Sequence, residues 1–564
     1  MLTQWAGLAP VDVAEFLAVV AFLTSAILVL SDSYSRSAIR SNWQFLSVCL
    51  LILVAFRIPL HAFFHGTEYE DSYVYGASER EPQISNNSVG SPYLVSTCTI
   101  GSIQSCESWQ TFSGHYIGYT SVLRLASRWL GDTPATSNWV NLLASCVAVL
   151  TVFLICGLIG SERLTAVAAC LMFASTPVFA IYGMASFSEP LSNACLAIAL
   201  YCYLRFIHFG HANRRLQMLN WVALTATLLF AITVKRENVL LAVGLPIGTI
   251  LVLNLGRTVE KLDAHNLKLA LLSCTVVVLF CAVELQYARS LQKEVSEFGG
   301  FPFGIANFKE LGPAFVKSFF LPEWYSFTVL LVAVGVVATF LKRGLTVIPS
   351  LLLVMYWGLY TTHVRSYYQL HGGHVSPNEA FRYSMNLISL WSIVAGFGLA
   401  QIVNHRLGLL NERRRVLIAC AFVYILVCYV VVRKLQNGAE SEEWAIRINP
   451  AMTAAKYAND LGTSDTFIVT PEPLVIQMFA PKNVNIISLD RIDTGALRSL
   501  QTNHPNLKLL YLKYSSYAER QASSRYSREM ECLDEMIQGD LYSDSHFALM
   551  QIEVPTGDRL KCAD

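Results

Sequence analysis

Residues 220–255 read NWVALTATLLFAITVKRENVLLAVGLPIGTILVLNL. Two apolar runs in this stretch, 220–234 and 239–255, flank the four-residue turn Lys235-Arg236-Glu237-Asn238. Each run is close to the length that a helix needs to cross a hydrocarbon layer roughly 30 Å thick. The stretch therefore predicts two membrane-spanning helices joined by a tight, charged turn.

Apolar runs of this kind recur upstream and downstream of the hairpin. The first run has no basic segment before it and no small-residue cleavage site, so it is predicted to be a span and not a signal peptide. In total the sequence predicts twelve spans, near 11–30, 44–60, 138–159, 164–182, 190–207, 220–234, 239–255, 269–288, 326–341, 345–360, 384–403 and 416–432.

The charge density of the chain changes near residue 434. Over residues 434–564, 31 of 131 side chains are charged, whereas the 433 residues before them carry only 50. We therefore expect a polytopic all-α membrane domain over 1–433, with a large external loop at 61–137, followed by a small soluble α/β domain over 434–564. A formal net charge of +1 gives no basic surface for nucleic acid.

The tail alternates between helical and strand patterns, as small α/β domains do. Helices are predicted at 450–461, 472–479 and 517–538, and strands at 466–470, 484–489, 507–512 and 547–554.

The loops between the predicted spans differ in their basic residues. One alternate set totals 60 residues and holds 15 Lys and Arg, whereas the other set totals 148 residues and holds 11. Basic residues favour the cytoplasmic side, so the first set is predicted to be cytoplasmic. With twelve spans, both termini and the tail are then predicted to lie outside. Four cysteines beyond the spans also fall in regions predicted to be external: Cys98, Cys106, Cys532 and Cys562.

Unusual polar residues gather on the predicted external side. Three carboxylates, Glu68, Glu70 and Asp71, follow the second span in a tyrosine-rich setting. Carboxylates at a membrane edge are functional candidates, and the alternative is a solvated acidic loop with interfacial tyrosines. The segment 114–129, which contains His115 and Tyr116, is amphipathic and predicts a helix lying in the interface.

Cations on the same side are candidates for binding a phosphate. Lys235 and Arg236 fill half of the tight turn, and an anion at the water–lipid boundary pairs well with such groups. The alternative is that both side chains extend towards lipid head groups. Glu189 opens the fifth span, and Arg382-Tyr383 precede the eleventh.

Soluble-type nucleotide and metal sites are not indicated. His371 and His374 are separated by two glycines, and neither a cysteine nor a carboxylate completes a close ligand set. The chain has no glycine-rich phosphate loop and no Gly-x-Ser-x-Gly or His-Glu-x-x-His motif. No cofactor is therefore predicted, and a divalent cation stays an open alternative without a ligand set to indicate it.

In their order and common side, these motifs resemble those of the GT-C superfamily of integral membrane glycosyltransferases. The resemblance is to bacterial relatives of the protein O-mannosyltransferase and lipid A aminoarabinose transferase groups. It rests on short motifs along most of the chain: Glu70-Asp71-Ser72-Tyr73, His115-Tyr116, Ser188-Glu189-Pro190, Lys235-Arg236-Glu237 and Arg382-Tyr383. The acidic pair is Glu-Asp where many relatives have Asp-Glu, so the base is open between Asp71 and Glu70. The late motif lacks the usual prolines after Arg-Tyr.

The resemblance implies transfer of a sugar, with inversion, from a polyprenyl-phosphate donor to a lipid, glycan or protein acceptor outside the cytoplasm. Asp71 or Glu70 would take the acceptor proton, and Lys235, Arg236 and Arg382 would stabilise the leaving phosphate. The remaining candidates for donor or substrate binding are Tyr383, His115, Tyr116, Glu189, Glu237 and Glu68.

The setting implied is a bacterial inner membrane, with the catalytic loops and the tail in the periplasm and a role in the cell envelope. An endoplasmic reticulum membrane is the alternative. The rival function is a multi-span transporter or flippase. That class places charges at the bilayer midplane, whereas the predicted spans here are nearly free of charge.

Overall fold

The computed structural model describes the chain in segments, and its contacts divide into two compact units, with residues 438–564 in the second. The described residues are 10–64, 94–95, 109–110, 117–131, 134–159, 163–176, 179, 183, 188–209, 213–254, 264–292, 325, 328–342, 344–363, 385–406, 411, 414, 418, 421, 425, 449–461, 466–470, 476, 485–488, 508–514 and 533–553.

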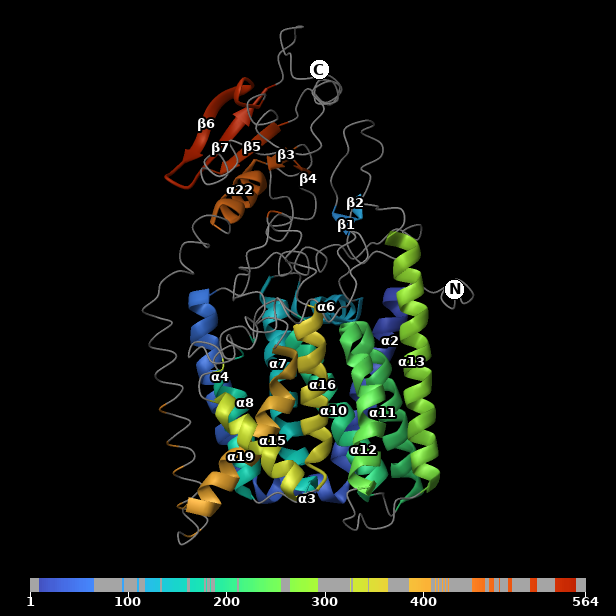
Figure 1. Cartoon of the computed structure of the whole chain (residues 1–564). Helices are drawn as coiled ribbons and strands as arrows, with labels where there is room; N and C mark the ends of the chain where they lie inside the picture. The colour runs from blue at the N-terminus through green and yellow to red at the C-terminus, as the bar shows by residue number, and fades with distance from the viewer. Residues whose placement is uncertain are drawn as a thin grey trace. The chain divides into compact units, whose positions relative to one another are not determined.

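The first unit is a bundle of apolar helices (Figure 1). Its helices are α2 (Pro10–Ser31), α3 (Ser33–Ser41), α4 (Trp43–Phe64), α7 (Pro134–Leu158), α8 (Arg163–Ser175), α10 (Glu189–Leu204), α11 (Arg214–Val234), α12 (Val239–Asn254), α13 (Ala264–Gln292), α15 (Thr328–Lys342), α16 (Val347–His363) and α19 (Ile388–Arg406). Helix α6 (Ile117–Leu130) begins in this unit. Short helical turns are η1 (Arg205–Phe209), η2 (Arg236–Asn238) and η3 (Met385–Leu387). The two short strands β1 (Leu94–Val95) and β2 (Trp109–Gln110) pair with each other and belong to the second unit.

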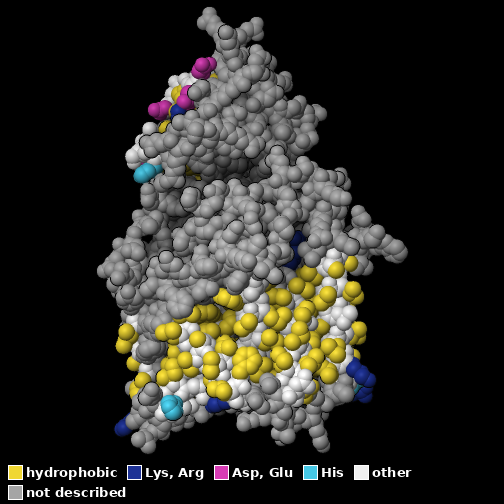
Figure 2. All heavy atoms as spheres, viewed as in Figure 1, with side chains coloured by type: hydrophobic (Ala, Val, Ile, Leu, Met, Phe, Trp, Pro, Cys, Tyr) yellow, Lys and Arg dark blue, Asp and Glu magenta, His cyan; other side chains and the backbone are white. Residues whose placement is uncertain are grey.

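Seven described helices are long and apolar enough to cross a membrane. An eighth candidate is the bent pair Ser33–Ser41 and Trp43–Ala55, and α8, α15 and most of α16 form shorter apolar helices. On the face that Figure 2 shows, hydrophobic side chains cover most of the described helical surface, as expected of helices in contact with lipid. The structure is thus mostly helical with several candidate spans, and the number twelve stays a prediction.

Local sequence explains where the helices of the quoted hairpin start and stop. The Asn213 side chain caps α11 by accepting a hydrogen bond from the Arg215 N–H at 2.8 Å. At the other end Lys235 adopts an extended backbone, with φ −159°, and this ends α11. The chain then makes the single turn η2 and enters α12.

Several element boundaries differ from those predicted, and two of the differences have a local cause. Residues 31–43 were expected to be a loop, but most of them form α3, because Asp32 caps it by accepting from the Ser35 N–H at 3.3 Å. Within the predicted span 164–182, helix α8 ends at Ser175, and Phe179 is again helical. Pro177 follows in the sequence, and the residue before a proline disfavours helical geometry.

Glycines allow close packing of α19 on its neighbours. A Cβ atom added at Gly396 would lie 2.6 Å from the backbone nitrogen of Ala169 in α8. A Cβ atom added at Gly398 would lie even closer to the Leu331 carbonyl oxygen of α15. Small residues at such crossings let helices approach without a hydrophobic driving force from water, so α19 is held firmly between α8 and α15.

The described part of the tail forms a mixed five-stranded sheet with one helix against it. The strand order is β4-β3-β5-β7-β6, in which β3 is parallel to β4 and β5, and β7 is antiparallel to β5 and β6. The elements are α22 (Asn449–Asp460), β3 (Thr466–Thr470), β4 (Asn485–Ser488), β5 (Lys508–Tyr514), β6 (Ile537–Ser543) and β7 (Phe547–Ile552).

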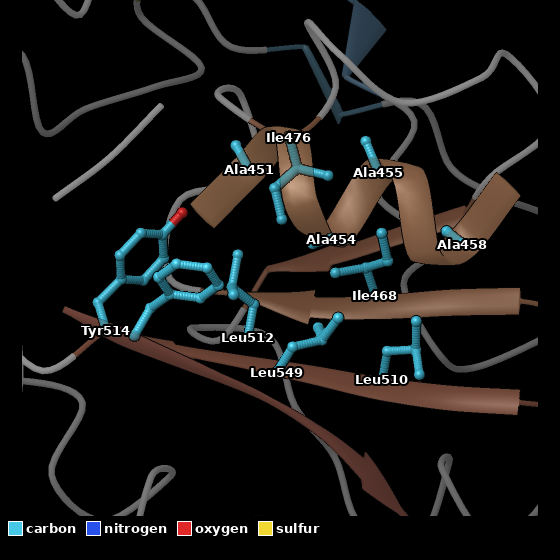
Figure 3. Close-up of a cluster of buried hydrophobic side chains, with 11 residues drawn as sticks. Ala451, Ala454, Ala455, Ala458, Ile468, Ile476, Leu510, Leu512, Tyr514 and Leu549 are labelled. Carbon is cyan, nitrogen blue, oxygen red and sulfur yellow. The ribbon is translucent and has the colours of Figure 1, made fainter. Parts of the chain in front are cut away.

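The alanine-rich face of α22 supplies one side of the tail core (Figure 3). Ala454 and Ala458 are buried against Ile468, Leu510 and other strand residues. The predicted helix 517–538 is wrong at its end, because residues from Ile537 onward form β6. The Asp544 carboxylate accepts the N–H groups of His546 and Phe547, which forms the turn that pairs β6 with β7.

Candidate functional site

A buried ion pair lies at one end of the helix bundle. The Lys235 Nζ atom is 2.8 Å from Glu189 Oε1, and each side chain is only 2% exposed. Glu189 is the first residue of α10, with Pro190 after it, and Lys235 follows the last residue of α11. We call this end of the bundle the outer end, because the loops here are the ones predicted to be external.

Asn238 connects the turn to two helices beside the ion pair. Its Nδ2 group donates to Ser192 Oγ and to the Ala231 carbonyl, both at 2.8 Å. Its Oδ1 atom accepts from the Tyr356 hydroxyl of α16 at 2.9 Å. Because buried amides are costly unless hydrogen-bonded, these contacts fix the turn on α10 and α16.

A second pair of asparagines connects α10 and α16 to α19. Asn193 Oδ1 accepts from the Ser389 N–H at 3.1 Å, and the Asn193 Nδ2 group donates to the Met385 carbonyl. Asn386 donates to the Tyr360 hydroxyl at 3.0 Å. The Tyr360 ring centroid also lies 5.7 Å from the Lys235 ammonium, a favourable cation–π distance. The outer end is therefore a fixed polar cluster built from α10, the end of α11, η2, α16, η3 and the start of α19.

The start of α6 lies against the same turn. A Cβ atom added at Gly118 would fall 2.7 Å from the backbone nitrogen of Val234, the residue before Lys235. The Tyr119 hydroxyl accepts from Asn141 of α7 at 2.9 Å, which holds α6 in place. The helix predicted at 114–129 is thus present as α6, and its first turn approaches the ion pair.

The structure brings together two of the predicted site residues, Glu189 and Lys235. Arg236 and Glu237 lie in η2 next to them and are half-buried. The other candidates lie outside the described residues: Glu68, Glu70, Asp71, His115, Tyr116, Arg382 and Tyr383. Within the described part of the chain, no group of three or more His, Cys, Asp or Glu could hold a metal ion.

Sequence reasoning missed Arg57 and the hydrogen bonds of three asparagines. These are Asn193, Asn238 and Asn386, which we call the asparagine cluster. Arg57 lies in α4 and is 1% exposed. Its Nη2 group donates to the Phe179 carbonyl at 3.3 Å, and its guanidinium lies 4.6 Å from the centre of the Phe179 ring. A single arginine inside an otherwise apolar run was the signal that could have found it.

No protein-family model and no curated protein matches the sequence. Among solved structures, the chain is similar to ArnT from Cupriavidus metallidurans in the apo state, with a TM-score of 0.55 and 12% identity over 91% of this chain and 98% of that one. ArnT bound to undecaprenyl phosphate gives a TM-score of 0.49 and 11% identity, over 93% and 99% of the two chains.

The chain is also similar to the Archaeoglobus fulgidus oligosaccharyltransferase tethered to an acceptor peptide. That match has a TM-score of 0.46 and 11% identity, over 92% of this chain and 75% of that one. The chain accordingly has the fold of ArnT along nearly the full length of both proteins.

Proposed function

With the ArnT fold as the premise, we propose that this chain is a membrane glycosyltransferase that takes a sugar from a lipid-phosphate donor. A fold by itself hosts many functions, so the proposal depends on the site. The observation that carries it is the buried Glu189–Lys235 pair with its asparagine cluster, which lies at one end of apolar helices. Such a position suits chemistry on a substrate whose lipid part lies in the membrane and whose sugar lies in water.

The reaction that we propose is an inverting displacement at the anomeric carbon. The acceptor hydroxyl oxygen forms a bond to this carbon while the bond from the carbon to the phosphate oxygen breaks. Asp71 or Glu70 takes the hydroxyl proton as general base. The electron pair of the broken bond stays on the lipid phosphate, whose added charge is stabilised by nearby cations.

The ion pair assigns different work to the candidate cations. Because Glu189 already balances the charge of Lys235 at 2.8 Å, the pair mainly fixes the turn that follows it. In our proposal, Arg236 in that turn and Arg382 are the cations that bind the donor phosphate. His115, Tyr116, Tyr383, Glu68 and Glu237 complete the surroundings of the sugar and the acceptor.

A transporter is the second function considered, and the described ion pairs argue against it. Glu189 opens α10, and Arg205, paired with Asp32 at 2.9 Å, follows its last residue. The two pairs are thus at opposite ends of one helix, about 24 Å apart at 1.5 Å per residue. Transporter sites instead lie near the middle of the membrane.

The experiment uses purified protein in nanodiscs with a panel of polyprenyl-phosphate sugars and a membrane extract as acceptor. We expect wild-type protein to release polyprenyl phosphate, and Asp71→Asn or Glu70→Gln to abolish release. Asp540→Asn, an exposed carboxylate in the edge strand β6, is the matched control and keeps wild-type turnover. If wild type consumes no donor but moves solute or lipid across vesicles, the transporter replaces the proposal.

A further inference from the structure

Arg57 is a buried cation in the membrane part of the chain. It lies in α4, seven residues before the helix ends at Phe64, and its exposed fraction is 1%. Its Nη2 group reaches the Phe179 carbonyl, but its Nε and Nη1 groups have no hydrogen-bond partner in the described structure. An arginine inside a membrane protein is costly, and such residues usually pair with an anion or mark a functional site.

The two other cations in comparable positions are neutralised. Lys235 pairs with Glu189 at 2.8 Å, and Arg205 pairs with Asp32 at 2.9 Å. For Arg57, no carboxylate among the described residues forms such a pair, and its partners are a carbonyl and an aromatic ring. Among the described residues, Arg57 is therefore a buried positive charge that an anion could complement.

The backbone near Arg57 fits closely around the guanidinium. A Cβ atom added at Gly183 would lie 2.6 Å from Arg57 Nε, so the chain approaches more closely than a side chain would allow. The Gly183 N–H donates to the Phe179 carbonyl at 2.8 Å, and this carbonyl is the one that Arg57 contacts. The guanidinium is thus held in one orientation before any ligand binds.

Arg57 and its neighbour Gly183 each precede, in the sequence, a residue of the proposed chemistry. Asp71 follows Arg57 by 14 residues, and Gly183 precedes Glu189 by six. We propose that Arg57 binds the phosphate of the lipid-linked donor through its unpartnered N–H groups. This inference rests on the proposed function and deepens it: when the bond to the anomeric carbon breaks, the electron pair stays on a phosphate oxygen hydrogen-bonded to Arg57.

The test measures binding of two probes, undecaprenyl phosphate and the neutral alcohol undecaprenol, to the purified full-length protein in nanodiscs. Wild type should prefer the phosphate. Arg57→Gln should lower affinity for the phosphate about tenfold or more, the loss expected for a charged hydrogen bond, and leave the affinity for undecaprenol unchanged. Arg57→Lys keeps the charge and should retain part of the preference. Arg214→Gln, an exposed cation at the start of α11, should bind both probes as wild type does.

The outcomes separate this inference from the proposed function. If wild type shows no preference for the phosphate, the lipid-phosphate donor and the role of Arg57 both fail. If wild type prefers the phosphate and Arg57→Gln prefers it equally, only the role of Arg57 fails. In that case the residue merely stabilises the fold, and the variant shows a lower unfolding midpoint with unchanged discrimination. If Arg57→Gln does not fold, Arg57→Lys decides: a preference for the phosphate weaker than that of wild type supports the guanidinium contact, because only the charge is kept, and a preference equal to that of wild type overturns it.

Discussion

The Glu189–Lys235 ion pair makes a quantitative prediction, because both side chains are 2% exposed. Glu189→Gln keeps the shape of the side chain but removes the carboxylate charge that lies 2.8 Å from the buried Lys235 ammonium. At 2.8 Å and an effective dielectric constant of about 20, two unit charges attract by about 6 kcal/mol. Since desolvation offsets part of this attraction, we expect a net loss of about 3–5 kcal/mol, as found when one partner of a buried pair is removed.

The assay is the free energy of unfolding in mixed micelles, measured by titration with a denaturing detergent. Glu189→Gln should lower this free energy by the stated amount, and the double variant Glu189→Gln/Lys235→Met should recover most of the loss, because no uncompensated charge remains. The matched control is Asp534→Asn, which breaks the tail pair with Lys513 at 2.5 Å, where the side chains are 37% and 29% exposed. A pair this exposed contributes about 0–1 kcal/mol.

Two results would refute this reasoning. One is a loss in Glu189→Gln no larger than in Asp534→Asn. The other is a double variant as unstable as the single one, which would mean that the carboxylate acts through packing or hydrogen bonds and not through the charge of Lys235. Donor turnover measured on the same variants adds a second readout, since the double variant should stay folded and yet turn over more slowly than wild type.

Three further predictions follow from the outer end and the tail. Gly118→Val should reduce donor turnover about tenfold or more, because its Cβ would meet the Val234 backbone at 2.7 Å and displace the start of α6; unchanged turnover would show that α6 has no part in the site. Asn238→Ala should lower the free energy of unfolding by about 1–3 kcal/mol, since Ser192 and Tyr356 each lose a buried hydrogen-bond partner. A loss below about 0.5 kcal/mol would show that these hydrogen bonds do not stabilise the fold. An alkaline phosphatase domain fused after Asp564 should be active in a bacterial host and a fluorescent protein fused there dark, because the basic loops predict an external tail; the reverse pattern would overturn the predicted orientation.

The membrane helices could be predicted where burial in lipid alone decides the structure. The α11–α12 hairpin follows from two apolar runs and a charged turn. The turn and the end of α12 lie within one residue of the prediction, whereas α11 begins at Arg214, six residues before the predicted start. Helix α3 could not be predicted in this way, because it is polar and depends on the Asp32 cap. The strand β6 was missed for a similar reason, since pairing with β7 outweighs a charged pattern that looks helical.

The sequence named some residues of the candidate site but not the contacts between them. Glu189 and Lys235 were both named from their positions at span ends, but their pairing depends on how α10 and α11 pack across 46 residues of sequence. Asn193 and Asn386 were missed because an asparagine in an apolar run shows no partner until its neighbouring helices are placed. Most of the predicted external residues, Asp71 and Arg382 among them, lie outside the described residues, so their roles stay predictions.

Helix α10 is fastened at both ends, by Glu189 to Lys235 and by the adjoining Arg205 to Asp32. A slide of α10 along its own axis by one helical turn, about 5.4 Å, would break both ion pairs at once. Piston-like motion of this helix is therefore expected to be too costly to occur within a catalytic cycle. Helix α10 would then keep the same axial position relative to its neighbours while substrates enter and leave. The position of a bound phosphate relative to the bilayer surface would therefore be set by the protein and not by the lipid.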